Sequence, residues 1–309
     1  MKKEKLPIHF APLQGYTDAI YRQAHARIFG GIASYYTPFV RIEHGDFRRK
    51  DVRELEAENN RGVVLTPQLI ASTPETILHI LSLFIEKGYQ EVDINLGCPF
   101  PTLAKRHNGA GLLPYPDEVK ALLSAALEAH PDIRFSVKMR LGWEDAAECM
   151  ALLPLLNSLP LSHITMHPRL GKQQYKGEVD LEAFQRFYAE CEKPLVYNGD
   201  LLTLDDIERI ESRFPRLAGL MIGRGLLANP ALAIEYQQGE PLSPSNDGEN
   251  PVAPCRCLQP IRQPARRGRT ATPHQNAHVL GIPPTRWRPQ SEKGYPQNIQ
   301  AQQLSGGSK

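Results

Sequence analysis

Short apolar runs alternate with longer amphipathic stretches over the first 240 residues. The runs are rich in aliphatic, β-branched or aromatic residues, and Gly, Pro, Asn or Asp lies near the ends of most of them, which is typical of β-strands. Proline cannot donate to a strand ladder, so Pro67 is expected at the end of its strand. We predict eight strands, at residues 8–13, 33–39, 63–68, 93–96, 135–140, 162–167, 194–198 and 217–222.

Helical periodicity fills most of the intervals between these runs. Thr17 and Asp18 offer a cap for a helix that runs to about Ile28, and Thr73 with Pro74 begins another. Further helices are predicted at 117–129, 145–156, 181–191 and 204–214. Residues 43–60 are charged and weakly periodic, and no element is predicted there. The second helix has an apolar face formed by Ile77, Ile80, Leu81, Phe84 and Ile85.

Eight strands alternating with helices over about 240 residues favour the α/β class and a (β/α)8 TIM barrel spanning residues 1–240. Runs that look apolar throughout suit a parallel sheet covered by helices. A doubly wound open sheet is the alternative, but no G-x-G-x-x-G follows the first strand.

Residues 241–309 differ in composition from the rest of the chain. They contain eleven prolines and no phenylalanine, with nine Lys or Arg against three acidic residues. Such a segment buries too little apolar surface to offset the entropy of ordering, so this atypical tail is expected to be disordered. The 240 residues before it carry 31 acidic and 27 basic residues, so attraction to nucleic acid depends on local patches or on the tail.

Bulk properties narrow the class of protein. No apolar run reaches the length of a membrane span, and the N-terminus lacks the apolar segment of a secretory signal. Five cysteines form no even framework, so a cytoplasmic protein is expected. Cys255 and Cys257 are too closely spaced for the usual zinc motif, and no metal site is predicted.

Polar side chains stand at the ends of the predicted strands. Singly, a histidine or cysteine in such a place is more often structural than functional. In a TIM barrel, however, the carboxyl ends of all strands face one mouth, where catalysis takes place. The residues expected there are Gln68, Asn95, Cys98, Lys138, Arg140, His167, Arg169, Asn198, Asp200 and Arg224.

Two glycine-bearing loops indicate the class of ligand. Asn198-Gly199-Asp200 and Gly223-Arg224 follow the last two strands, where TIM barrels often bind phosphate. Glycine lets backbone N–H groups approach the oxygens, and arginine adds a fork of donors. The simpler interpretation is that these glycines only form tight turns. Lys138 suits either a flavoenzyme or an aldolase. Cys98 favours the flavoenzyme, because an unperturbed thiol is protonated at neutral pH and can serve as a general acid.

Four segments together resemble the tRNA-dihydrouridine synthases, over roughly residues 7–238. They are Ala11-Pro12-Leu13 with Gln14 to Asp18, Asn95-Leu96-Gly97-Cys98-Pro99 with Gly109 to Leu113, residues 136–143, and Ile222-Gly223-Arg224-Gly225. The Asn-x-Gly-Cys-Pro segment is the most specific of these. Leu13-Gln14 departs mildly from the family's usual residues.

The resemblance implies an FMN-dependent oxidoreductase that reduces the C5–C6 double bond of a uridine in tRNA, with NADPH or NADH as reductant. Cys98 would protonate the base, and Asn95, Arg140 and Arg169 would hold it. In this family a helical tRNA-binding domain follows the barrel, and residues 241–309 stand in its place. The residues expected to bind FMN are Pro12, Gln68, Lys138, His167, Asn198, Gly199, Asp200, Gly223 and Arg224.

Two other functions remain open at this point. One is an FMN barrel that reduces a free pyrimidine, and the other is a truncated protein that binds flavin or RNA with impaired turnover. The expected partner is tRNA, with no membrane association and no obligate protein partner.

Overall fold

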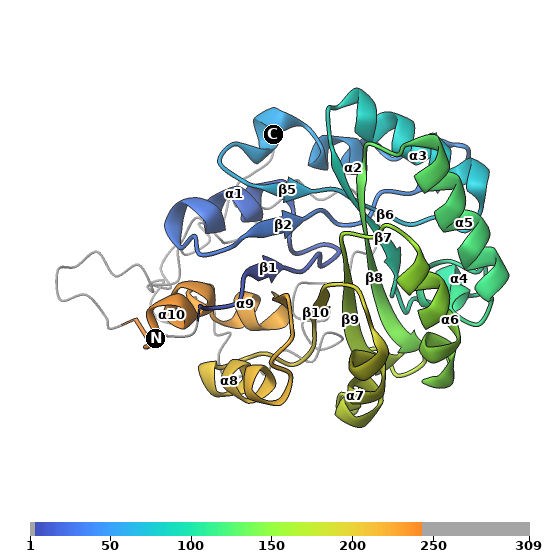
Figure 1. Cartoon of the computed structure of the whole chain (residues 1–309). Coiled ribbons are helices and arrows are strands. Elements are labelled where there is room, and N and C mark those ends of the chain that lie inside the picture. The colour runs from blue at the N-terminus through green and yellow to red at the C-terminus, as the bar shows by residue number, and fades with distance from the viewer. Residues whose placement is uncertain (1–3, 243–309) are drawn as a thin grey trace, which may run out of the picture.

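The computed structural model describes residues 4–242, and its centre is a barrel of parallel strands with helices around it (Figure 1). Hydrogen bonding runs in the order β5-β2-β1-β11-β10-β9-β8-β7-β6. The predicted TIM barrel is therefore confirmed. The strands are β1 (Ile8–Phe10), β2 (Ser34–Tyr36), β5 (Leu65–Thr66), β6 (Gln68–Leu69), β7 (Glu91–Leu96), β8 (Arg134–Gly142), β9 (His163–Leu170), β10 (Leu195–Tyr197) and β11 (Gly219–Ile222).

Pro67 divides the third barrel strand instead of ending it, which corrects the predicted position. Strand β5 pairs with β2 on one side, and β6 pairs with β7 on the other. Pro67 alone separates β5 from β6, so the ring of strands closes at this residue. Its missing N–H costs no ladder bond there, while its carbonyl accepts from the N–H of Asp93 at 3.0 Å.

The helices follow the strands as the periodicity predicts. Asp18 and Thr73 cap the first two long helices by accepting from backbone N–H groups. Ile85, predicted on the apolar face of α3, is instead 36% exposed, while the other four residues of that face are buried. The helices are α1 (Ala19–Ile28), α3 (Pro74–Glu86), α4 (Pro101–Ala104), α5 (Pro116–Ala129), α6 (Ala147–Ser158), α7 (Leu181–Glu190), α8 (Leu204–Arg213), α9 (Arg224–Ala228) and α10 (Leu232–Gln238), with a 3₁₀ turn η2 (Gly109–Leu112).

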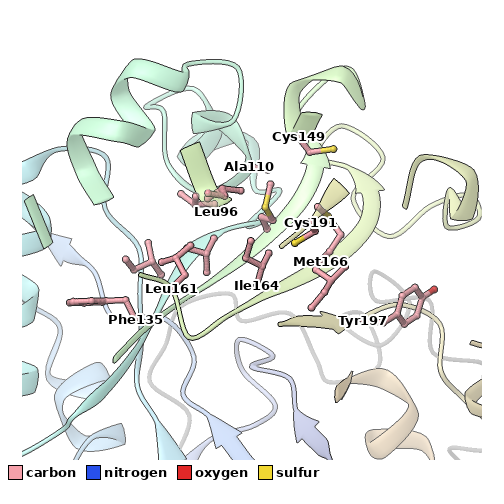
Figure 2. Packing of buried hydrophobic residues seen from close by; sticks show 14 of the residues in the cluster. Leu96, Ala110, Phe135, Cys149, Leu161, Ile164, Met166, Cys191 and Tyr197 are labelled. Carbon is pink, nitrogen blue, oxygen red and sulfur yellow. The ribbon is translucent and has the colours of Figure 1, made fainter. Parts of the chain in front are cut away.

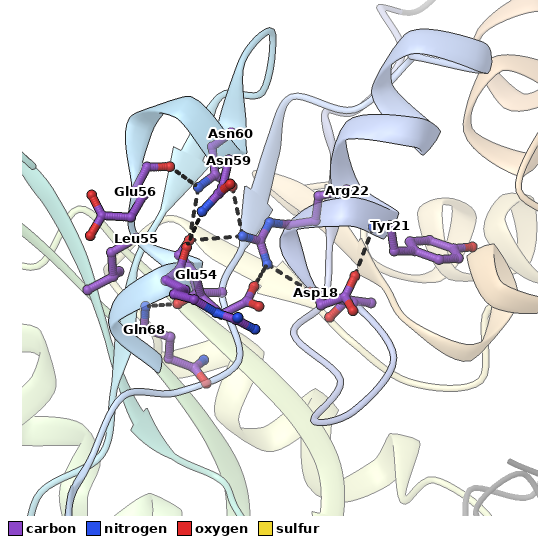
Figure 3. Close-up of polar contacts among 12 residues, drawn as sticks. Asp18, Tyr21, Arg22, Glu54, Leu55, Glu56, Asn59, Asn60 and Gln68 are labelled. Atoms are coloured by element: carbon purple, nitrogen blue, oxygen red, sulfur yellow. Dashed lines mark hydrogen bonds and ion pairs between the residues drawn. The ribbon is translucent and has the colours of Figure 1, made fainter. Parts of the chain in front are cut away.

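The segment that gave no prediction, 43–60, is part of a small excursion between β2 and β5. It contains a two-stranded hairpin (β3, Ile42–Glu43; β4, Asp46–Phe47), α2 (Arg49–Glu54) and a 3₁₀ turn η1 (Ala57–Asn60). Arg22 of α1 anchors it, as Figure 3 shows. Its buried guanidinium donates to Glu54 Oε2 at 2.9 Å and to Asn60 Oδ1 at 2.7 Å. These polar contacts hold the excursion in place together with Leu55, which is buried in the main core.

Strands β7, β8 and β9 alternate between an apolar outer face and a polar inner face. Outward residues such as Phe135, Ile164 and Met166 pack in the main core between strands and helices, part of which Figure 2 shows. Inward residues of β8 are Ser136, Lys138 and Arg140. The expectation of strands that are apolar throughout is therefore wrong for these three, because the barrel interior is a polar network.

The described part of the chain, residues 4–242, has no helix long and apolar enough to cross a membrane. Within the same residues no group of three His, Cys, Asp or Glu side chains is placed to hold a metal ion. Cys255, Cys257 and the whole predicted tail from 243 onward lie outside the described residues.

Candidate active site

A pocket opens at the carboxyl ends of the barrel strands. Its empty space is about 880 Å³, a volume that includes open solvent at its mouth. Of the thirteen residues predicted from the sequence for catalysis or binding, Arg169 alone does not line it. The twelve that do are Pro12, Gln68, Asn95, Cys98, Lys138, Arg140, His167, Asn198, Gly199, Asp200, Gly223 and Arg224.

The Cys98 loop is fixed by the last polar residue of β7. Asn95 Oδ1 accepts from the N–H of Gly97 at 3.0 Å and from the N–H of Cys98 at 2.8 Å. On the other side, the Cys98 carbonyl accepts from the N–H of Ala110 at 3.0 Å. Three hydrogen bonds therefore hold the main chain that carries the thiol.

Gly109 packs directly against Cys98. It has φ +61°, and a Cβ there would lie 2.7 Å from Cys98 Cβ and 2.9 Å from Cys98 N. A side chain at this position is excluded both by conformation and by space. The close packing of Gly109 against Cys98 therefore helps to fix the position of the thiol.

The thiol of Cys98 is nearly buried, with 6% of the residue exposed. Burial raises its pKa, against the opposing influence of the Phe100 N–H and of Arg140, Arg41 and Lys138. Because an unperturbed thiol is already protonated at pH 7, the raised pKa keeps the proton in place. Cys98 is therefore suited to donate a proton, not to attack as a thiolate.

A chain of side-chain hydrogen bonds lies beneath the pocket. Asp93 is fully buried and accepts from Gln68 Nε2 and from Ser136 Oγ, each at 2.6 Å. Gln68 Oε1 in turn accepts from Asn95 Nδ2 at 2.8 Å. A carboxylate only accepts, so Asp93 fixes which end of the Gln68 amide faces Asn95. The orientation of the Gln68 amide in turn sets that of Asn95, whose Oδ1 holds the Cys98 loop.

Two cations of β8 face the same pocket. Burial, and then Arg140, lower the pKa of Lys138 to about 8, while Asp93 and Cys98 act to raise it. Arg140 is 2% exposed. Its guanidinium donates to the carbonyls of Gly97 at 3.0 Å, Leu170 at 3.0 Å and Gln174 at 2.7 Å. Arg140 thus joins the Cys98 loop to the loop after β9.

His167 is neutral and its tautomer is determined by Arg169. Burial, followed by four nearby cations, holds the pKa of His167 well below its usual value. Arg169 Nη1 lies 3.1 Å from His167 Nε2. Because a guanidinium can only donate, Nε2 accepts and the proton is on Nδ1. His167 therefore carries a single N–H donor, at Nδ1.

Arg169 is buried behind the pocket in a bidentate ion pair with Asp200. Its Nη1 and Nη2 atoms donate to the two carboxylate oxygens at 3.0 and 2.5 Å, and Nη2 also donates to the Gly177 carbonyl at 2.7 Å. Asp200 pairs with Arg224 as well. One carboxylate therefore orients two arginines, of which only Arg224 reaches the pocket.

Close packing explains two glycines of the last loops. A Cβ at Gly225 would lie 2.0 Å from the Leu201 carbonyl oxygen, and one at Gly199 would lie 3.0 Å from Val179. Asn198 ties the two loops together by donating from Nδ2 to the Met221 carbonyl at 2.7 Å. The two loops expected to bind phosphate are thus adjacent and tightly packed.

Fourteen residues that line the pocket were absent from the sequence-based set, and so was Asp93, which lies beneath it. Gln14, Phe100 and Tyr175 are among the fourteen. Tyr175 lies between two arginines, with the guanidinium carbons of Arg140 and Arg224 at 5.5 and 5.6 Å from its ring centre. Asp93 could have been found from its spacing, since it is two residues before Asn95 on the same face. Tyr175 lies in a loop and carries no such signal.

The chain was compared with known protein families. The family model described as dihydrouridine synthase matches residues 9–293 of this chain. The chain belongs to the dihydrouridine synthase family.

Curated relatives agree with this membership of the dihydrouridine synthase family. The tRNA-dihydrouridine(16) synthase of Pseudomonas syringae pv. tomato is 30% identical over 249 residues, covering 77% of this chain and 78% of the relative. The protein of the same name from Haemophilus ducreyi is 29% identical over 239 residues, covering 74% and 73%. The chain thus spans about three quarters of each relative.

Solved structures share the fold of this dihydrouridine synthase family member. The old yellow enzyme from Trypanosoma cruzi superposes with a TM-score of 0.54 at 15% identity, over 79% of this chain and 93% of that one. Morphinone reductase superposes with a TM-score of 0.54 at 12% identity, over 78% and 88%. At such low identity these likenesses support the barrel fold alone.

Proposed function

We propose that the protein is a tRNA-dihydrouridine synthase, which reduces the C5–C6 double bond of a uridine in tRNA with FMN as cofactor and NADPH as reductant. Family membership supports the activity. The observation that carries the proposal is a nearly buried, protonated Cys98 at the wall of a pocket with Lys138 and Arg224. Its place of action is the cytoplasm, where tRNA is modified.

The pocket residues fit a flavin mononucleotide. Gln14 Oε1 is buried and has no hydrogen-bond partner within residues 4–242, so a ligand in the pocket can supply one. Gln68 and Lys138 form a polar edge for the ring system, and Pro12 lies on the pocket wall. The phosphate would be held at the adjacent loops by Asn198, Gly199, Gly223 and Arg224.

His167 and Asp200 support this cofactor site in different ways. His167 would donate from Nδ1–H, the position of its proton when Nε2 accepts from Arg169. Asp200 carries a negative charge near the phosphate, but it is paired with both Arg169 and Arg224. Its role would be to orient Arg224. With FMN bound, Lys138 would supply a positive charge that stabilises the electron-rich reduced ring.

The chemistry that FMN would supply here, when bound, is a hydride to C6 of the uracil ring. Cys98 then donates the thiol proton to C5, so the double bond gains one hydride and one proton, and the thiolate regains its proton from solvent. Burial of the thiol keeps it protonated until the base arrives. The target base must leave its stack to reach the pocket, which costs a few kcal/mol.

Asn95 and Arg140 line the pocket and would border the uracil. Arg169, expected from the resemblance to hold the substrate, does not line the pocket and instead pairs with Asp200 and His167. We assign it an indirect role, in which it orients these two residues. Replacing Arg169 would then reduce the affinity for FMN more than the affinity for tRNA.

The test of the proposed function is Cys98→Ala. The variant should retain FMN and its reduction by NADPH, whereas dihydrouridine formation on unmodified tRNA should fall by about 100-fold or more, the scale of a general acid. Flavin absorbance and a dihydrouridine assay measure the two outcomes. Cys149→Ala is the matched control, because Cys149 is buried in the core away from the pocket.

Two results would contradict the proposal. If Cys98→Ala forms product at the parent rate, Cys98 is not the acid. If the parent enzyme reduces free uridine or uracil as readily as tRNA, the substrate assignment is wrong and a free-pyrimidine reductase is the better description.

A further inference from the structure

Phe100 is an exposed aromatic residue at the wall of the active-site pocket. Five large hydrophobic residues between 4 and 242 are exposed, namely Ile20, Val64, Ile85, Phe100 and Tyr115. Phe100 is 49% exposed, and among these five it alone lines the pocket. Its ring is therefore available to contact a ligand that occupies the pocket.

The position of Phe100 is fixed by its neighbours in the chain. Pro99 and Pro101 flank it, and its backbone is extended, with φ −67° and ψ +122°. Its carbonyl accepts from the N–H groups of Leu103 and Ala104, both at 2.9 Å, which begins helix α4. A proline on either side removes backbone freedom, so little entropy is lost when the ring makes a contact.

Phe100 is also tied to the catalytic residue. It is two residues after Cys98, and its N–H interacts with the Cys98 sulfur, opposing the rise in the thiol pKa. Cys98 and Phe100 line the same pocket, so a ligand that delivers a base to Cys98 can also contact the Phe100 side chain. Cys98, which would contact the reacting base, and Phe100 belong to the same turn of the chain.

The local charge suits a polyanion. From Pro99 to Tyr115 the chain has no acidic residue, and Lys105 and Arg106 are both exposed. Lys105 and Arg106 follow Phe100 within one short segment, and exposed cations together with an exposed aromatic ring suit single-stranded nucleic acid, in which bases stack on the ring and phosphates meet the cations.

We propose that Phe100 is a stacking site for the nucleobase next to the uridine that is reduced. The inference rests on the proposed function and extends it to a second nucleotide. When a base leaves its stack, its neighbour loses one stacking partner. The Phe100 ring replaces that partner and so recovers part of the cost of extracting the target base.

The test compares tRNA kinetics of Phe100→Ala with those of the parent. Stacking of one base on an aromatic ring contributes about 1–3 kcal/mol, which corresponds to a rise in KM for unmodified tRNA of about 5- to 150-fold. The kcat at saturating tRNA, the flavin content and the rate of flavin reduction by NADPH should stay at parent values. Phe100→Trp should restore the KM, because it retains a planar ring.

Two controls separate stacking from other effects. Val64→Ala removes an exposed apolar side chain that does not line the pocket, and its KM should equal that of the parent. The dependence of KM on salt should be unchanged in Phe100→Ala, since no phosphate contact is lost. Lys105→Ala with Arg106→Ala should weaken that dependence.

The proposal is overturned if Phe100→Ala has a KM within twofold of the parent. It is also overturned if Phe100→Leu restores the KM as well as Phe100→Trp does, because general apolar contact would then suffice. These results leave the proposed function intact, which fails only if the parent enzyme forms no dihydrouridine in tRNA.

Discussion

Asp93 is the residue on which the polar floor of the pocket depends. It accepts from Gln68 and Ser136 within the barrel, and its charge favours the protonated form of Lys138. Its own pKa is raised to about 6, first by burial, with Ser136, Gln68 and Lys138 acting in the opposite direction. Between about pH 6, the pKa of Asp93, and about pH 8, the pKa of Lys138, the carboxylate is ionised and the lysine is charged. The proposed chemistry requires this state.

Asp93→Asn should lower the pH above which activity is lost. Burial and Arg140 lower the pKa of Lys138 to about 8, against the opposing influence of Asp93 and Cys98. Activity that needs the charged lysine falls as the pH rises through this value. Without the Asp93 charge the lysine loses its proton at lower pH, so the alkaline limb of kcat/KM for tRNA should move down by about one pH unit or more.

Ser136→Ala is the control for this experiment. It removes one hydrogen bond to Asp93 and keeps the carboxylate charge. The alkaline limb should then stay near the parent position. An unshifted limb in Asp93→Asn, measured on protein with normal flavin content, would show that Asp93 does not sustain the lysine charge.

At the scale of elements, the turns after the strands matter more for the site than the strands themselves. The loop from Gly97 to Asn108 and the 3₁₀ turn η2 form a closed unit in which Ala110 N–H bonds to the Cys98 carbonyl. Gly109 fits against Cys98 where no side chain fits. The geometry of the thiol is therefore set by contacts between two turns.

Gly109→Ala should displace Cys98 and reduce dihydrouridine formation by about 100-fold, because an error of about 1 Å in a reacting group has an effect of that size. Gly62→Ala is the matched control. Gly62 also has a positive φ, of +75°, but a Cβ there would meet nothing within 4 Å. Both variants should lose about 1 kcal/mol of stability from the backbone conformation, measured by urea unfolding. Equal activity in the two would contradict the role of the Gly109 contact.

For the whole molecule, buried histidines link stability to pH. Burial lowers the pKa of His9, His25 and His163 to about 4. His9 and His163 stack inside the barrel with ring centres 6.1 Å apart. Their neutral forms belong to the folded state, so protonation favours unfolding.

Stability should be full above about pH 6.5, the value for unfolded histidine, and should fall as the pH drops toward 4. At pH 5 each histidine would account for a loss of about 2 kcal/mol. Asp93, with a raised pKa of about 6, opposes this trend in part. Urea unfolding at pH 7 and pH 5 measures the difference in the free energy of unfolding.

His163→Gln should make the free energy of unfolding depend less on pH, while His44→Gln at an exposed turn should not. Equal stability at both pH values in the parent would contradict the account.

The local pattern of apolar and polar residues was enough to predict most strands and helices of this protein. Seven of the eight predicted strands follow from apolar runs with clear boundaries, and caps such as Thr73 begin helices where expected. Residues 43–60 gave no prediction because contacts with distant parts of the chain position them, above all the hydrogen bonds from Arg22 to Glu54 and Asn60. Pro67 was misplaced because it lies where the barrel closes, and closure is a property of the whole ring.

The sequence by itself determined the barrel, the chemical groups at its mouth and the family. Strand spacing and residue type are local, so one chain suffices to recognise them. Only the tertiary structure decided which groups meet. It placed Arg169 behind the pocket on Asp200, brought Tyr175 between two arginines, and joined Asp93 to Cys98 through Gln68 and Asn95. The physical reason is that these contacts depend on register between strands and on loop packing, which join residues distant in the chain.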